Sequence, residues 1–199
     1  MLARFLCRVG IRNPCSGSNS VRGAGSPSRR QSVVRSSGSE GSIVDPRYFV
    51  TVFTRSTWDR FVSTGGKVAG FKSNASGRVN RLVRGDLLLC YIVDGVGFVG
   101  ILEVTGATND LVDNGTWKIE DFPIQIPVQV VAELPVHAAV PMMSLIDQLP
   151  RLLAANTRQA GAWGGFIRGA PREWPQDEAR VVVQALTERR EQLDPRQPT

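Results

Sequence analysis

The residues with the clearest chemical potential are three arginines that recur at three-residue spacing, Arg78, Arg81 and Arg84, just after a Gly-Phe-Lys step at residues 70–72. This spacing places side chains on one face of a helical turn. Guanidinium groups contact phosphate oxygens, and nearby aromatic rings can stack on a nucleobase. The stretch therefore predicts contacts with phosphate and base. The alternative is that Phe71 packs in the core and the arginines are solvated.

A second dense stretch, residues 163–169, reads Trp-Gly-Gly-Phe-Ile-Arg-Gly. Glycines beside aromatic rings let a flat ligand approach the backbone, and Arg168 can reach a phosphate or carboxylate. Trp163 could instead plug one end of a barrel, and Trp58 is equally open to a core role. The candidate nucleic-acid-binding residues are Ser56, Trp58, Phe71, Lys72, Arg78, Arg81, Trp163 and Arg168.

No catalytic motif accompanies these candidates. The sequence lacks a P-loop, a GxGxxG turn after a strand, GxSxG and HExxH. His137 is the one histidine, and the three cysteines form no CxxC pair and no zinc spacing. Cys90 lies in an apolar run, where cysteine usually packs as a small hydrophobe. We therefore expect no enzymatic activity, no metal and no cofactor.

The basic charge is concentrated at the N-terminus. Residues 1–39 contain seven arginines and no acid, which leaves 17 of the 24 basic residues to face 18 acids. Apolar residues at positions 2, 5, 6 and 9 recur at helical spacing, as in a mitochondrial transit peptide. The other interpretation is an upstream extension of a bacterial reading frame. We expect residues 1–46 and 193–199 to be disordered, and a bacterial cytoplasmic location, or a mitochondrial one if the transit peptide is genuine.

The remaining charge is segregated along the chain. Residues 55–84 hold seven basic side chains and one acid, residues 85–147 hold nine acids and one lysine, and residues 151–172 hold four arginines and no acid. Such a distribution favours one basic and one acidic face, although a patchy solvated surface would look the same. If the arginines of residues 78–84 and Arg168 lay on opposite sides of the domain, the hypothesis of nucleic-acid binding would be weakened.

Short strands and helices must position these residues. The predicted strands are residues 48–54, 68–71, 87–93, 98–105 and 122–133. The predicted helices are residues 56–63, opened by a Ser56–Asp59 capping box, a turn at 80–84, residues 144–153 and residues 175–192. Residues 154–161 are typical of a linker and residues 163–168 of a short strand or turn. Pro123 and Pro127 suggest an edge strand or a bulge.

Antiparallel hairpins dominate this pattern, which favours an α+β fold built on a small barrel. No apolar run approaches the length of about 18 residues that a transmembrane helix needs, so we expect no membrane partner.

At this point the sequence resembles the EVE domains of the PUA-like superfamily. The motifs, in order, are Tyr48-Phe49-Val50, Ser56, Trp58 and Phe61, Gly70-Phe71-Lys72, Gly85-Asp86, Cys90-Tyr91, Phe98-Val99-Gly100 with Glu103-Val104, and Trp163 with Arg168-Gly169 and Arg172. The resemblance covers residues 47–192. It implies a PUA-like mixed or antiparallel β-barrel with flanking short helices.

The resemblance also implies a function. EVE domains look like relatives of the YTH readers of methylated adenine. Some are thought to read methylated or hydroxymethylated cytosine in DNA, in restriction and defence systems, by flipping the base into an aromatic pocket. Many relatives have Trp where Ala69 stands here, and that ring helps form the cage. The sequence departs from the family pattern at this position.

Two hypotheses follow. The first is a non-catalytic module that reads a modified base, with Phe71 and Trp163 on the base and Lys72, Arg78, Arg81 and Arg168 on the backbone. Its partner would be modified DNA in the first instance, or RNA, with a nuclease or effector protein as a further partner. The second is a small-ligand or protein-interaction module that does not bind nucleic acid.

Overall fold

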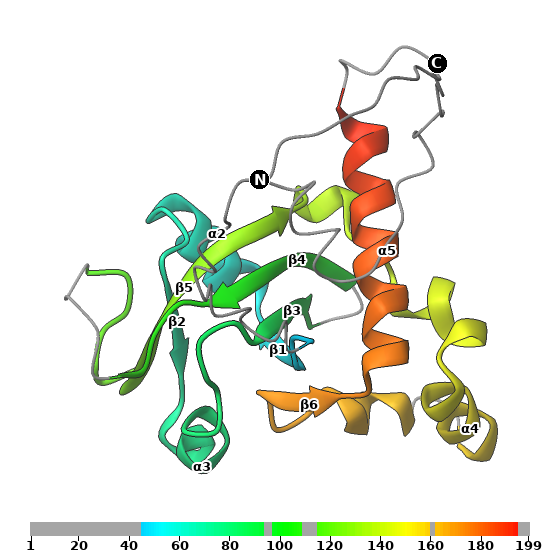
Figure 1. Cartoon of the computed structure of the whole chain (residues 1–199), viewed down its shortest axis with the longest axis horizontal. Coiled ribbons are helices and arrows are strands. Elements are labelled where there is room, and N and C mark those ends of the chain that lie inside the picture. Colours follow the sequence, from blue (N-terminus) through cyan, green and yellow to red (C-terminus); the bar gives the residue numbers. More distant parts are fainter. Residues whose placement is uncertain (1–44, 94–96, 109–114, 160–161, 195–199) are drawn as a thin grey trace, which may run out of the picture.

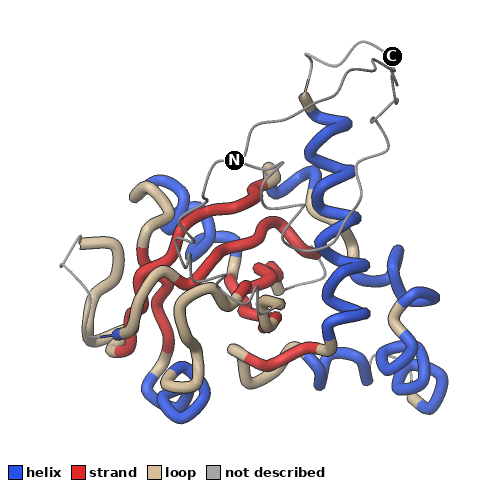
Figure 2. The backbone as a smooth tube through the Cα atoms, viewed as in Figure 1, coloured by secondary structure: helices blue, strands red, loops and turns tan. Residues whose placement is uncertain are grey.

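A curled six-stranded mixed sheet organises the fold (Figures 1 and 2). The computed structural model describes residues 45–93, 97–108, 115–159 and 162–194. In the order β2-β5-β4-β3-β1-β6, the strands are β2 (Val68–Phe71), β5 (Ile124–Glu133), β4 (Gly97–Val104), β3 (Leu87–Ile92), β1 (Tyr48–Phe53) and β6 (Arg172–Trp174). β1 runs parallel to β3, and the other pairs are antiparallel. The predicted α+β fold is confirmed, with the sheet curled into a half-barrel, and the parallel pair makes it the mixed form of the two that were expected.

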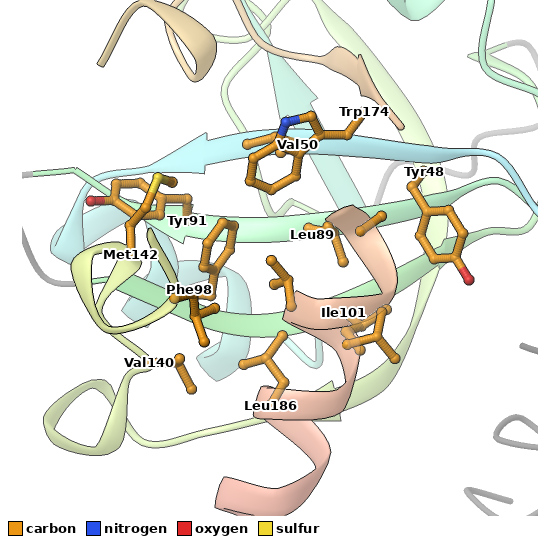
Figure 3. Packing of buried hydrophobic residues seen from close by; sticks show 14 of the residues in the cluster. Tyr48, Val50, Leu89, Tyr91, Phe98, Ile101, Val140, Met142, Trp174 and Leu186 are labelled. Atoms are coloured by element: carbon orange, nitrogen blue, oxygen red, sulfur yellow. The ribbon is translucent and has the colours of Figure 1, made fainter. Parts of the chain in front are cut away.

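Strand β3 is buried on both faces, which explains why its sequence shows no polar alternation. One cluster takes Leu87, Leu89 and Tyr91, and a second takes Leu88, Cys90 and Ile92. Figure 3 shows the first cluster, in which Leu89 and Phe98 face Leu186 of the long C-terminal helix. Burial raises the pKa of the Cys90 thiol well above its ordinary value, so this group stays neutral and inert.

Helices cover the two faces of the sheet. Helix α5 (Gln176–Leu193) buries the predicted stripe of Ala179, Val182, Val183 and Leu186, each 0% exposed. It packs together with η4 (Met142–Gln148), a 3₁₀ segment that follows η3 (Val136–Ala138). The opposite cluster includes residues of helix α2 (Arg55–Ser63) and of the short helix α3 (Ser76–Val79). Among the described residues, no helix has the length and apolarity to cross a membrane.

The N-terminal cap of α2 differs from the prediction. Thr54 is the N-cap, and Thr54 and Thr57 form the capping box: the Thr54 hydroxyl accepts from the Thr57 amide at 3.2 Å, and the Thr57 hydroxyl accepts from the Thr54 amide at 2.9 Å. The predicted Ser56–Asp59 box is therefore wrong, because Thr54 has the extended backbone that a cap requires. Ser56 already lies inside the helix.

The prediction of an edge strand at residues 122–133 is also wrong, because β5 lies between β2 and β4. β5 pairs with β2 from Ile124 to Pro127 and with β4 from Val128 to Glu133. Pro127 stands where one ladder ends and the other begins, so its missing N–H costs little. The alternative of a bulge holds, because the β4–β5 register shifts between Ile101 and Leu102.

Other differences concern short segments. Pro150 opens helix α4 (Pro150–Arg158) instead of ending a helix, since proline is tolerated at the first helical position. The predicted linker is thus helical as far as Arg158, and residues 162–166 form a 3₁₀ turn, η5 (Ala162–Phe166). The helical turn expected at 80–84 occurs earlier, in η1 (Ser73–Ala75) and α3. The predicted termini, residues 1–46 and 193–199, lie mostly outside the described residues.

Candidate nucleic-acid interface

Arginines from two distant segments line one cleft of about 420 Å³. One side, which we call the α3 wall, consists of Arg78 and Arg81. The other, which we call the β6 wall, consists of Arg168, Gly169, Pro171, Arg172 and Glu173. The α3 wall follows edge strand β2, and the β6 wall includes edge strand β6, so the cleft lies between segments at the two edges of the sheet. Four guanidinium groups and one carboxylate share this space.

The α3 wall is anchored by an ion pair behind it. Arg47 donates from Nε and from one terminal nitrogen to the two carboxylate oxygens of Asp86, at 3.0 and 2.6 Å, and the same terminal nitrogen donates to the Arg81 carbonyl at 2.8 Å. Asp86, which is 3% exposed, also accepts from the Val83 amide at 2.8 Å. These bonds fix the backbone that carries Arg81. The hydrogen bond to Asp86 raises the pKa of Arg47, which favours the charged guanidinium.

The β6 wall is anchored by an aromatic ring. Arg172 donates to the Gly165 carbonyl at 2.8 Å, and its guanidinium carbon lies 5.8 Å from the centroid of the Phe166 ring. Arg151 lies 5.7 Å from the same ring and pairs with Glu178, whose side chain is 2% exposed, at 3.0 Å. Phe166 therefore links the ion pair of the buried Glu178 to an arginine of the cleft.

The four arginines of the cleft carry no carboxylate partner within 4.0 Å in the part of the chain that the structure describes. Arg78 donates only to the Asn74 carbonyl, at 3.2 Å, and its Nε is buried without a hydrogen-bond partner among those residues. Guanidinium groups gathered in this way repel one another, and an anion relieves the repulsion. The arrangement therefore favours an anion over a cation in the cleft.

Three of the predicted site residues meet in this cleft: Arg78, Arg81 and Arg168. The arrangement that would have weakened nucleic-acid binding, with these groups on opposite sides, does not occur. Arg84 does not line the cleft, because α3 ends at Val79 and the helical spacing is not maintained. The side chain of Trp163 falls outside the described residues.

The other predicted residues lie elsewhere. Trp58 is 2% exposed, stacks on Phe61 at 5.5 Å and approaches β4 closely at Gly100, where an added Cβ would lie 3.0 Å from the indole ring. Phe71 is 6% exposed and belongs to the same cluster. The structure thus places both rings in the core, the alternative that the sequence left open. Figure 1 shows α2 well apart from α3, with β2 between them.

Lys72 and Ser56 are exposed, and neither lines the cleft. Lys72 lies 4.7 Å above the Phe122 ring, and the Ser56 hydroxyl lies 3.0 Å from that of Thr54. Ala69, where relatives of the EVE type have Trp, is 1% exposed and packs in the core.

Sequence reasoning missed two members of the β6 wall, Arg172 and Glu173. Strand β6 has only three residues, too few for any periodic signal. The one available clue was that the acid-free run of residues 151–172 ends at Arg172.

The lining of the cleft is dominated by arginine. None of its lining residues, within the described ranges, is aromatic, Ser, Thr, Cys, Lys or His. The described residues also contain no group of three or more His, Cys, Asp or Glu side chains that could hold a metal ion. Hydrogen-bond donors dominate, since a guanidinium has five N–H groups and no acceptor.

No known protein-family profile matches the sequence. None of the curated proteins matches it. Among solved structures, the fold is similar to that of YTH domains. The YTH domain of Pho92 in complex with m6A has a TM-score of 0.52 and 17% identity, over 71% of this chain and 83% of that chain.

Two further YTH domains are similar to the same extent. The Mmi1 YTH domain has a TM-score of 0.51 and 11% identity, over 74% of this chain and 78% of that one. The YTH domain of the Zygosaccharomyces rouxii MRB1 protein, in complex with N6-methyladenosine RNA, has a TM-score of 0.50 and 17% identity, over 71% and 86%. These likenesses establish a YTH-like fold. The resemblance to EVE domains stays a prediction.

Proposed function

We propose that this domain is a non-catalytic nucleic-acid-binding module that reads a modified base. The observation that carries the proposal is the convergence of four arginines on one cleft without carboxylate partners in the described chain. Phosphate oxygens are the anions that arginine binds in nucleic acids. Arginine planes also stack on bases, so the cleft can hold a nucleotide without an aromatic cage.

The size of the cleft favours one nucleotide over a duplex groove. Its volume of about 420 Å³ is within the range of pockets that enclose a small ligand, roughly 300–1,000 Å³. We therefore propose that a single nucleotide leaves the stack to enter it, which costs a few kcal/mol in a duplex and less in a single strand.

Two considerations support a modified base as the ligand. The YTH domains of Pho92 and of the MRB1 protein were solved with m6A and with N6-methyladenosine RNA. The resemblance to EVE domains instead implies methylated or hydroxymethylated cytosine in DNA. Both share a methylated nucleobase. Either nucleic acid would be read by this domain alone or together with a partner nuclease or effector protein.

A binding panel tests the proposal. Fluorescently labelled DNA and RNA strands, unmodified or carrying one methylcytosine, hydroxymethylcytosine or N6-methyladenine, would be titrated at two salt concentrations. We expect binding that weakens with salt and a preference for one modified strand. The double variant Arg78→Ala/Arg168→Ala should lose binding, whereas Arg84→Ala, outside the cleft, should retain most of it.

An affinity that changes neither with the salt concentration nor with the modification of the base would contradict the proposal. Binding of free mononucleotides or pyrophosphate without binding of any strand would point to the small-ligand function instead.

A further inference from the structure

Glu173 is the one carboxylate among the seven residues that line the cleft. It pairs with Phe49 in the β1–β6 ladder, and its side chain is exposed. β6 is an edge strand, and the cleft is lined by both Arg172 and Glu173, although neighbouring side chains of a strand point to opposite faces. In the described chain Glu173 has neither an ion pair within 4.0 Å nor a hydrogen bond.

Phosphate binding alone does not account for this carboxylate. A negative charge beside four arginines weakens the field that attracts an anion. Here it forms no ion pair with them, and it acts only at longer range on Arg47, whose pKa it helps to raise after the larger effect of Asp86. A ligand held only by its phosphate would bind better without it. The position of Glu173 therefore indicates a ligand that carries a hydrogen-bond donor as well as an anionic group.

The side chains of the cleft include many hydrogen-bond donors and few acceptors. Arg78, Arg81, Arg168 and Arg172 are donors only, so they serve the phosphate oxygens and the acceptor atoms of a base. An ionised carboxylate is an acceptor only. A donor on the ligand must therefore use the Glu173 carboxylate or a main-chain carbonyl.

Building on the proposed function, we propose that Glu173 accepts a hydrogen bond from the exocyclic amino group of the bound base. Cytosine, adenine and guanine each carry such a group, and a glutamate that accepts from cytosine N4 is a known form of base readout. Uracil and thymine offer only N3–H, flanked by two carbonyl oxygens that repel the second carboxylate oxygen. The cleft thus selects amino-bearing bases over uracil and thymine.

This selectivity is compatible with the modifications proposed above. Methylation at C5 of cytosine leaves the amino group untouched, and a single methyl on an amino nitrogen leaves one N–H to donate. A second methyl on that nitrogen removes the donor, so dimethylated adenine should lose the contact with Glu173. The inference therefore separates mono- from dimethylated amino groups.

The test uses single-stranded oligonucleotides that differ only in one central base. The full chain should bind strands with central cytosine, adenine or guanine, as a group, more tightly than strands with uracil or thymine, by roughly tenfold or more. Glu173→Gln should bring this ratio close to one, because an amide both accepts and donates, and should tighten binding to every strand. Glu188→Gln, an exposed acid bonded to Gln184 on α5, is the control that keeps the ratio.

The outcomes are separable. A base preference that is unchanged in Glu173→Gln would overturn the inference. So would a wild-type protein without base preference whose affinity for every strand rises equally in Glu173→Gln, because Glu173 would then only oppose the phosphate. Wild-type protein that binds no strand at all overturns the proposed function as well. Tighter binding of dimethyladenine than of monomethyladenine would also contradict the role of Glu173.

Discussion

The α3 wall and the β6 wall hold their arginines by different contacts. Behind each wall stands an arginine–carboxylate pair of nearly the same exposure, 41% and 4% for Arg47–Asp86 and 42% and 2% for Arg151–Glu178. On the α3 wall, Arg47 of the pair donates a hydrogen bond to the main-chain carbonyl of Arg81. On the β6 wall it reaches the cleft through the Phe166 ring.

The difference determines which part of each wall is fixed. A main-chain anchor holds the backbone of Arg81 and leaves its guanidinium free to move toward a ligand. The Phe166 ring and the Gly165 carbonyl hold the guanidinium of Arg172 itself. In both walls the buried acid neutralises the supporting arginine and not those of the cleft. The guanidinium of Arg172 is thus pre-organised, and that of Arg81 adapts.

The largest expected effect comes from removing the two buried acids. Asp86→Ala and Glu178→Ala each break bonds to a guanidinium and to a main-chain amide, at 2.8 Å for Val83 and 3.0 Å for Arg151. We expect both to lower the free energy of unfolding by about 1–3 kcal/mol, measured by urea denaturation. Asp59→Ala, on the exposed side of α2, should change it little. A loss confined to one variant would show that the two pairs are not equivalent.

The next effect concerns one arginine from each wall. Arg172→Ala should weaken oligonucleotide binding by about tenfold and Arg81→Ala by about threefold, because a pre-organised group loses less entropy when it binds. Each should lower the slope of log affinity against log salt by roughly one contact. Titrations at several salt concentrations measure both quantities, with Arg84→Ala as the control. Equal losses would contradict the division into a fixed and an adaptable guanidinium.

A smaller effect should follow from Arg47→Lys, which keeps the charge but loses the fork that spans Asp86 and the Arg81 carbonyl. We expect binding to weaken by up to about threefold, no more than in Arg81→Ala, because Arg47 acts through that residue. The same change made in Arg81→Ala protein should have almost no further effect, because the two residues act as one unit. Additive losses in this cycle would show that Arg47 does not act through Arg81.

The smallest effect is expected from Phe166→Leu, which keeps apolar volume but removes the ring beneath Arg172. Loss of a cation–π contact at this exposed site should weaken binding by about 0.5 kcal/mol, with the salt slope unchanged. Phe122→Leu removes the ring beneath Lys72, outside the cleft, and serves as the matched control. A similar loss in the control would mean that the rings act only through general stability.

Elements with a strong local signal could be predicted from the sequence. β3 is covered on both faces, so its sequence is an unbroken apolar run. α5 is covered on one face, so its apolar residues form a stripe with helical spacing. The basic residues of the cleft could also be identified in the sequence, because basic segments of the chain form a basic surface in the fold. Arg78, Arg81 and Arg168 were therefore within reach of sequence reasoning, although their meeting in one cleft was not.

The rest depends on tertiary contacts. A ring on an amphipathic helix has the same spacing whether it packs in the core or meets a ligand, so the location of Trp58 could not be decided. β6 is too short to leave a pattern, and with it Arg172 and Glu173 were missed. The parallel pairing of β1 with β3 joins segments that no turn connects, and turn chemistry is what identifies strand partners in a sequence.

The ladder between β1 and β6 has a consequence for how the protein is made. Tyr48 pairs with Trp174, so β1, near the start of the described chain, can complete its pairing only after β6, near the end, has been synthesised. During synthesis, at about 5–20 residues per second, β1 has one open edge until β6 emerges from the ribosome, and open edges invite pairing with other chains. The same segment carries the β6 wall. A nascent chain therefore completes the cleft and covers the open edge of β1 at residues 48–50 in a single late step.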